Sequence, residues 1–142
     1  MSTINTPVRP AGETTGTARR PKQRLADSAL SYELAEESKA LIAEARTVSD
    51  GRAAKTLSKH PGLNTVMTAL RRGTVVRQHL TPAPVMIQVI SGTVRLQLPS
   101  SPLEMHPGGL LTLAENVAHE VEAVTDASFL ITVTAHRLTG QA

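Results

Sequence analysis

The chain has 142 residues and a mass of 15.1 kDa, a length that suits one domain with its own core. It contains no cysteine, which excludes a disulfide scaffold, a thiolate zinc site and a cysteine nucleophile. Its only aromatic residues are Tyr32 and Phe129, too few for the stacking platforms that bind single-stranded nucleic acid. No apolar run reaches the about 20 residues of a membrane-spanning helix. We therefore expect a cytoplasmic protein with neither a membrane nor a nucleic acid as its partner.

The net charge of +3 is unevenly distributed along the chain. Residues 1–24 hold five basic residues and one acidic residue, and they are rich in Thr, Pro and Gly with almost nothing to bury. This composition predicts a disordered basic tail. The pair Arg19-Arg20 is not followed by an apolar core, so we do not interpret it as an export signal.

Residues 25–49 are expected to hold a helix, most regular over residues 27–47, because Ala, Leu, Glu and Lys dominate and no Gly or Pro interrupts. Asp27 or Ser28 is the expected cap at its start. The apolar residues that recur at helical spacing are Leu30, Leu34, Leu41 and Ala45. This stripe is narrow and Ser38 interrupts it. The helix is expected to pack on the outside of its own domain or against a second copy, and the sequence does not separate the two.

Residues 50–142 are expected to form an all-β domain. Short runs rich in Val, Ile, Leu and Thr recur there, and each is bounded by Gly, Pro, Ser or Asp. The expected strands are Ala53–Lys59, Leu63–Arg71, Val75–Leu80, Val85–Ile90, Thr93–Leu98, Leu110–Leu113, Ala118–Val124 and Ser128–Thr134. The segment Pro99–Pro102 is interpreted as a turn. Strands at this spacing favour a small closed barrel or a jelly roll.

One histidine falls on a strand with a clear alternation. His119, Val121 and Ala123 share one face of the expected strand, whereas Glu120 and Glu122 share the other. Because the apolar pair marks the interior, His119 should point inward and the glutamates outward.

A second histidine, His79, lies near the end of the expected strand 75–80. It shares a face with Thr81, but the same alternation would also place Val75 and Arg77 on that face. Two inward histidines on neighbouring strands can bind a divalent metal through neutral imidazole nitrogens. The alternative is a hydrogen-bonded imidazole that lines a pocket, since a metal normally takes three or four protein ligands. The remaining histidines are expected in turns or near the chain end: His60, His106 and His136.

Two segments resemble the conserved motifs of the cupin superfamily. Residues 73–92 resemble the first motif, in which a glycine is followed after five residues by His-x-His, then by Glu and later by a second glycine. Residues 107–123 resemble the second motif, which ends in a histidine after a Pro-x-Gly turn. The resemblance covers about residues 55–135. It implies a cupin-type jelly-roll barrel in residues 50–142, preceded by the helix of residues 25–49 and the tail of residues 1–24.

The family's metal ligands are usually two histidines and a glutamate from the first motif and one histidine from the second. His79 and His119 match, whereas Thr81 replaces the second histidine and Val85 replaces the glutamate. Gln88 is out of phase with Val85 and should face away from the interior. The resemblance therefore implies a degenerate site, in which His79 and His119 hold a divalent transition metal weakly or not at all.

The expected pocket is mostly apolar with a few polar groups, the usual make-up of a small-molecule site. Its expected ligand-binding residues are Thr81, Val85, Ile87 and Val121. The pocket has no inward carboxylate pair for glycoside hydrolysis, and the chain has no phosphate-binding glycine loop and no nucleophile elbow. The sequence names no substrate and does not establish catalysis.

Three functions from different classes follow from these observations. The first is a cupin barrel that binds a small molecule without turnover. The second is a metal-dependent enzyme of the dioxygenase or isomerase type with a reduced ligand set. The third is a scaffold that acts through its helix and basic tail. By resemblance we also expect a homodimer, in which Leu30, Leu34 and Leu41 could cover a sheet edge.

Overall fold

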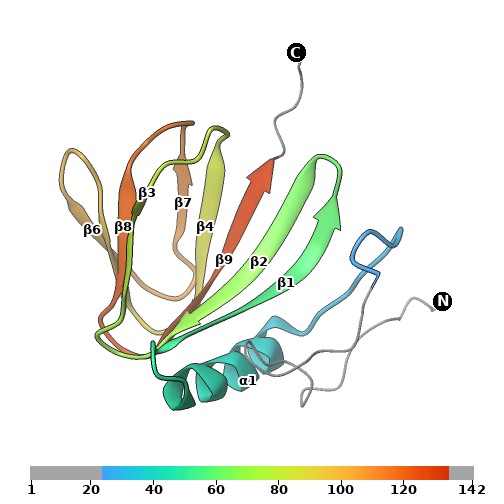
Figure 1. Ribbon diagram of the computed structural model, residues 1–142, viewed down its shortest axis with the longest axis horizontal. Helices are drawn as coiled ribbons and strands as arrows, with labels where there is room; N and C mark the ends of the chain where they lie inside the picture. The colour runs from blue at the N-terminus through green and yellow to red at the C-terminus, as the bar shows by residue number, and fades with distance from the viewer. Residues whose placement is uncertain (1–23, 135–142) are drawn as a thin grey trace.

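The computed structural model describes residues 24–134. The predicted tail of residues 1–24 and His136 lie outside the described residues, apart from Arg24. The described part of the chain folds into one helix and nine strands (Figure 1). The elements are α1 (Leu34–Thr47), β1 (Arg52–His60), β2 (Leu63–Leu70), β3 (Val75–His79), β4 (Val85–Ser91), β5 (Val94–Gln97), β6 (Pro102–Met105), β7 (Leu110–Leu113), β8 (His119–Ala123) and β9 (Ala127–Thr134).

The strands form two antiparallel sheets that face each other. The larger sheet has the order β1-β2-β9-β4-β7, and the smaller has the order β3-β8-β5-β6. Figure 1 shows the smaller sheet opposite the larger one, with α1 at the foot of β1, β2 and β9. The predicted all-β jelly-roll class is confirmed. Within residues 24–134, the helix is too short and too polar to cross a membrane.

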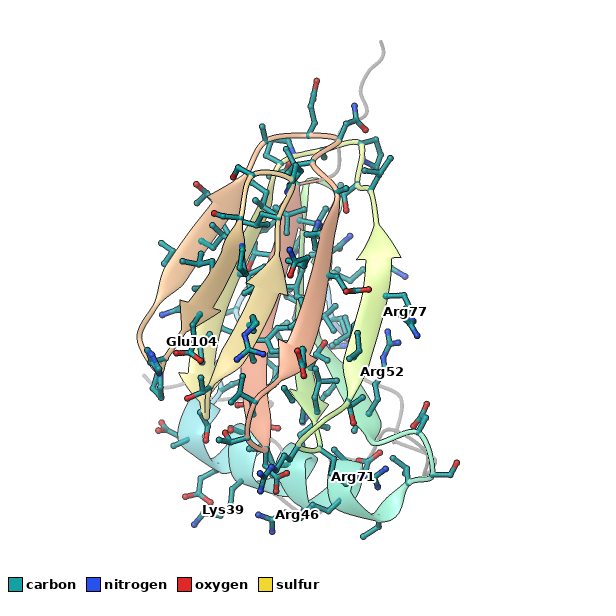
Figure 2. All side chains as sticks on the ribbon, turned by 90° about the vertical axis from the view of Figure 1, so that its left-hand side faces the viewer. Lys39, Arg46, Arg52, Arg71, Arg77 and Glu104 are labelled. Atoms are coloured by element: carbon teal, nitrogen blue, oxygen red, sulfur yellow. The ribbon has the colours of Figure 1, made fainter. Side chains whose placement is uncertain are left out.

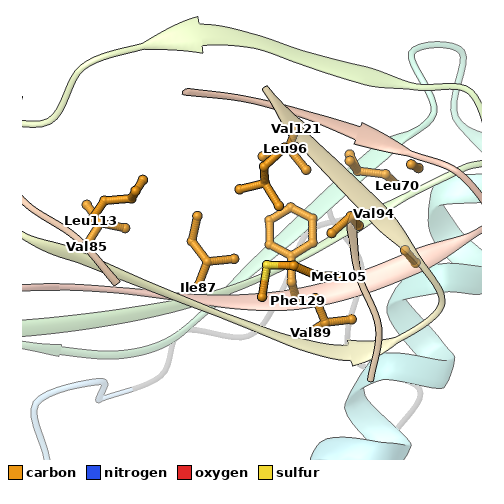
Figure 3. Packing of buried hydrophobic residues seen from close by; sticks show 12 residues of the cluster. Leu70, Val85, Ile87, Val89, Val94, Leu96, Met105, Leu113, Val121 and Phe129 are labelled. Carbon is orange, nitrogen blue, oxygen red and sulfur yellow. The ribbon is translucent and has the colours of Figure 1, made fainter. Parts of the chain in front are cut away.

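Side-chain alternation explains why the two sheets pack on each other. In β4, Val85, Ile87 and Val89 are buried, while Met86 and Gln88 are exposed. This period of two sends every second side chain into the space between the sheets. The core that results contains Phe129 amid branched side chains of both sheets, as Figure 3 shows.

The predicted strands agree with the structure to within one residue at each end, but one strand was missed. β6 (Pro102–Met105) pairs with β5 at the edge of the smaller sheet. The interpretation of Pro99–Pro102 as a turn was therefore wrong at its last residue. Proline is tolerated at the first position of an edge strand, where its missing N–H breaks no ladder bond. Because three of the four residues of β6 are exposed, the strand shows no apolar alternation.

The helix begins later than predicted. It starts at Leu34, after Glu33, and neither Asp27 nor Ser28 caps it. The preceding residues instead run beside the edge strand β1. The N–H of Lys59 donates to the carbonyl of Leu25 (2.8 Å), and the hydroxyl of Tyr32 donates to the carbonyl of Leu57 (2.6 Å). These bonds to the edge strand hold the segment outside a helix despite its helical composition.

The helix packs on the outer face of the larger sheet in its own chain. Leu41 and Ala45 are fully buried against Ala53 and Met67, and Leu34 packs beside them. Leu41 is therefore covered within its own chain, and the expected homodimer stays a prediction. Ser38, which interrupts the apolar stripe, is buried as well, and its hydroxyl is hydrogen-bonded to that of Ser128 at 2.6 Å.

A buried ion pair lies in the same interface. Lys55 Nζ is 2.6 Å from Glu37 Oε1, and the two side chains are only 2% and 4% exposed. The ring of Tyr32 lies 5.7 Å from the same ammonium group. A buried charge is costly unless it is paired and hydrogen-bonded, so each partner makes the other tolerable. Lys55 shares the face of β1 that buries Ala53 and Leu57, so it is buried although lysine is usually exposed.

We expect the single substitution Lys55→Met to lower the free energy of unfolding by about 3–5 kcal/mol, because it leaves the Glu37 carboxylate buried without this partner. The double substitution Glu37→Leu/Lys55→Met should recover most of that loss. Arg95→Met is the control, because its ion pairs with Glu104 and Glu122 are half exposed and should contribute only about 0–1 kcal/mol. Urea unfolding measures all three. A Lys55→Met loss no larger than that of the control would contradict the role of the buried pair.

A second polar contact ties the end of α1 to the sheets. Asp126 accepts a bond from the backbone N–H of Arg72 (2.8 Å) and another from the Arg46 guanidinium (2.6 Å). These two bonds hold the pKa of the Asp126 carboxyl below its usual value, and the bond from Arg72 has the larger effect. A lowered pKa in the folded state means that the carboxylate stabilises the fold at neutral pH.

Asp126→Asn should therefore be less stable than the parent at pH 7, and the difference should shrink as the pH falls below about 4, through the folded-state pKa. Glu115→Gln, in an exposed turn, is the control for the loss of one carboxylate. Thermal unfolding between pH 7 and pH 2.5 measures the difference. A gap that stays constant over this range would show that the Asp126 charge does not stabilise the fold.

Candidate functional site

A cavity of about 270 Å³ lies between the two sheets. It is on the side where β1 is the edge strand of the larger sheet and β3 is the edge strand of the smaller one. These two edge strands are not hydrogen-bonded to each other, and the cavity reaches solvent here at the exposed Arg52. The walls are mostly apolar and are formed by Ala54, Val66, Val76, Val85, Ile87, Val121, Phe129, Ile131 and Val133. The polar side chains in the lining are Arg52, Thr68, Thr81 and His119.

The structure brings most of the predicted site residues to this one cavity. Thr81, Val85, Ile87 and Val121, the expected ligand-binding residues, all line it, and so does His119. They come from β4, β8 and the loop before β4. Gln88 is exposed on the opposite face of β4, as its phase indicates.

The wall that β1 and β2 provide was not predicted from the sequence. Arg52 and Ala54 on β1, and Thr68 on β2, also line the cavity. Both strands precede the two motif-like segments, so the motifs themselves point to no site residue in them. The signal was the alternation in β1, where Ala53 and Lys55 point to the helix, whereas Arg52 and Ala54, in the opposite phase, point to the cavity.

His119 occupies a fixed position at one end of the cavity. Its side chain is 4% exposed, and its Nδ1 lies 3.0 Å from the carbonyl oxygen of Val117. A carbonyl oxygen only accepts, so Nδ1 carries the proton of this bond. In the neutral ring, Nε2 then holds the lone pair and is the basic or metal-binding nitrogen.

The two motif-like segments are joined directly beside this histidine. The N–H of Asn116 donates to the carbonyl of Thr81 at 2.7 Å. Asn116 adopts a positive φ of 61°, which asparagine tolerates better than most residues. The turn before His119 is therefore formed without the glycine of the cupin motif.

Only the backbone of His79 is described, and its register explains the imperfect parity of its strand. Val75 and Val76 pair with Glu122 and Val121, but the next pair is His79 with His119. A regular ladder would place Gln78 opposite His119, so one extra residue is inserted between Val76 and His79. This bulge lets the strand begin with Val75 exposed and still end with His79 in register with His119.

The described donor atoms do not fit a tightly held metal ion. Among the described residues, no group of three or more His, Asp, Glu or Cys side chains could hold one. The described cavity lining offers one imidazole and the hydroxyls of Thr68 and Thr81, and Val85 is a hydrocarbon. Divalent zinc, iron or copper sites use three or four imidazole, thiolate or carboxylate ligands. Even if His79 were added, the site would contain only two such ligands, both of them imidazoles.

Solved structures with the same architecture place this fold in a known class. KdgF from Halomonas sp. is 22% identical, with a TM-score of 0.58 over 63% of this chain and 85% of that one. A cupin superfamily protein from Desulfitobacterium hafniense is 9% identical, with a TM-score of 0.58 over 60% and 78%. A variant of salicylate 1,2-dioxygenase from Pseudoaminobacter salicylatoxidans is 17% identical, with a TM-score of 0.64 over 82% of this chain and 39% of the other.

No family model matches the chain, and no curated protein matches it either. The similarity to the solved structures is one of fold alone, because all three identities are below 25%. The chain therefore has the cupin fold, as the two motif-like segments predicted. Proteins of this fold include enzymes and proteins of unknown function, so the activity has to be argued from the site.

Proposed function

We propose that this protein binds a small, largely apolar molecule in the cavity between its sheets. The observation that carries the proposal is the composition of the lining, in which branched apolar side chains surround a few polar groups. Ligand sites have this make-up, because apolar walls supply affinity and a few placed polar groups fix the orientation.

The size of the cavity favours a small ligand. Its volume of about 270 Å³ is just below the about 300–1,000 Å³ typical of ligand sites. Most of the walls lie on strands, which hold side chains more precisely than loops do. His119 and Thr81 supply hydrogen bonds at one end. A neutral imidazole with a basic nitrogen can also remove a proton from a bound molecule, so binding is compatible with catalysis.

Benzamide, a small neutral probe with an apolar ring, should bind in this cavity and shift the amide resonances of Thr68, His119 and Val121 in a two-dimensional NMR titration. Ala54→Leu should weaken binding by at least about tenfold, because the larger side chain fills the cavity from the edge strand. Ala43→Leu is the matched control, since Ala43 is exposed on α1 and lies outside the cavity.

Both variants should keep the melting temperature of the parent to within a few degrees, which separates loss of binding from loss of fold. If millimolar benzamide leaves all cavity resonances unshifted in the parent, or if Ala54→Leu and Ala43→Leu bind it equally, small-molecule binding in this cavity is contradicted.

A second candidate is a metal-dependent enzyme of the dioxygenase or isomerase type with a reduced ligand set. The observation that favours it is the pairing of His79 with His119 across β3 and β8. One protein of similar fold is named a dioxygenase. In that case His79 and His119 would hold the metal, which would supply Lewis-acid or redox chemistry, and the walls of the cavity would position the substrate.

Metal analysis separates the two candidates. Protein purified without chelators should contain far less than one equivalent of transition metal, because two imidazoles are too few for tight binding. Mass spectrometry with inductively coupled plasma measures the content of the parent and of the His79→Ala and His119→Ala variants. About one metal per chain, lost in both variants, would replace the binding proposal with the enzyme.

A further inference from the structure

The cavity has one charged side chain in its described lining, Arg52, which begins the edge strand β1. We infer that the natural ligand carries a single carboxylate, and that Arg52 binds it at the mouth of the cavity. This inference rests on the proposed function and names the chemical class of its ligand.

Arg52 is placed on the cavity side by the alternation of β1. Its cross-strand partner is Leu70, and Ala54, two residues further on, pairs with Thr68. Leu70 belongs to the core between the sheets, and Ala54 and Thr68 line the cavity. Arg52 therefore shares the inner face of the sheet, but it is exposed because β1 is the outermost strand. Arg52 and Val76 of β3 line the same cavity, and Figure 2 shows Arg52 on the side of the molecule where β3 lies.

The guanidinium of Arg52 has no acidic partner among residues 24–134. Asp50 bonds to the backbone N–H of Arg52 (3.3 Å), not to its side chain. Other arginines of this region are engaged: Arg46 pairs with Asp126, Arg95 pairs with Glu122, and Arg71 donates to carbonyl groups at the end of α1. Arg52 is thus a cation held at a cavity with its donors available to a ligand.

The chemistry of the lining selects a carboxylate. A guanidinium offers two parallel N–H donors that match the two oxygens of a carboxylate, and the two charges cancel. A phosphate ester carries up to two negative charges, and the described lining contains no second cation to balance it. A neutral ligand would leave the charge of the Arg52 guanidinium without a counter-charge in the complex.

Arg52 and His119 lie toward opposite ends of the cavity. Gly51, next to Arg52, abuts Thr74, and the backbone of Thr74 is bonded to Ala123 at the end of β8. His119 begins β8, four residues earlier, which is about 13 Å along a strand. A ligand held by its carboxylate at Arg52 would therefore extend its apolar body inward along Ile87 and Phe129.

Three probes with one ring and different head groups test this inference: benzoate, benzamide and phenyl phosphate. The same NMR titration is carried out on the parent, on Arg52→Gln and on Arg77→Gln. Arg77 is the matched control, because it is an 87% exposed arginine on β3 that lies outside the cavity lining. Benzoate should bind the parent more tightly than the other two probes do. Arg52→Gln should weaken benzoate binding by about 3- to 10-fold, since solvent screens a charge pair at an exposed mouth, and should leave benzamide binding unchanged.

Each other result overturns the inference in a distinguishable way. If benzoate and benzamide bind equally and Arg52→Gln affects neither, the cavity binds small molecules and the carboxylate assignment is wrong. If phenyl phosphate binds more tightly than benzoate, the anion is a phosphate. If Arg77→Gln weakens benzoate binding as much as Arg52→Gln does, the affinity depends on the net charge of the protein and not on Arg52. If no probe shifts the cavity resonances, the proposed function fails together with the inference.

Discussion

The buried pair of Lys55 and Glu37 ties the edge strand β1 to α1, and much of the candidate site depends on that strand. Lys55 faces α1 and is almost fully buried, so β1 has to stay against the helix for the ammonium to keep its carboxylate. The residues of opposite phase, Arg52 and Ala54, then form one wall of the cavity. An edge strand is otherwise free to fray or to pair with another chain. The helix therefore adds to the β1–β2 ladder in holding this wall of the cavity in place.

The fold was predictable because its determinants are local. Runs of alternating apolar residues between glycines and prolines set the strands to within one residue, and the two motif-like segments set the class. β6 was missed because an exposed edge strand needs no apolar alternation. The start of the helix was missed because bonds to β1, made by Leu25 and Tyr32 across more than twenty residues, override the helical propensity of that segment.

The candidate site was predictable on one side only. His119 and Val121 followed from the alternation of their strand, and Thr81 and Val85 followed from the resemblance. Arg52 did not, because its importance comes from the position of β1 beside an opening in the barrel. The bulge that pairs His79 with His119 is also invisible in the sequence, since the extra residue is defined only by the partner strand.

The cavity combines a cupin fold with a donor set that does not suit a metal. Val85 stands where the motif has a carboxylate, and a hydrocarbon at that position turns a charged site into part of an apolar wall. The histidine of this wall, His119, has its Nδ1 fixed by the backbone carbonyl of Val117. The charge of the site lies instead at its mouth, on Arg52, where solvent lowers the cost of holding it in the free protein. Such a distribution of charge suits a ligand with a polar head and an apolar body, because binding would bring a partner to the one cation and leave the interior uncharged.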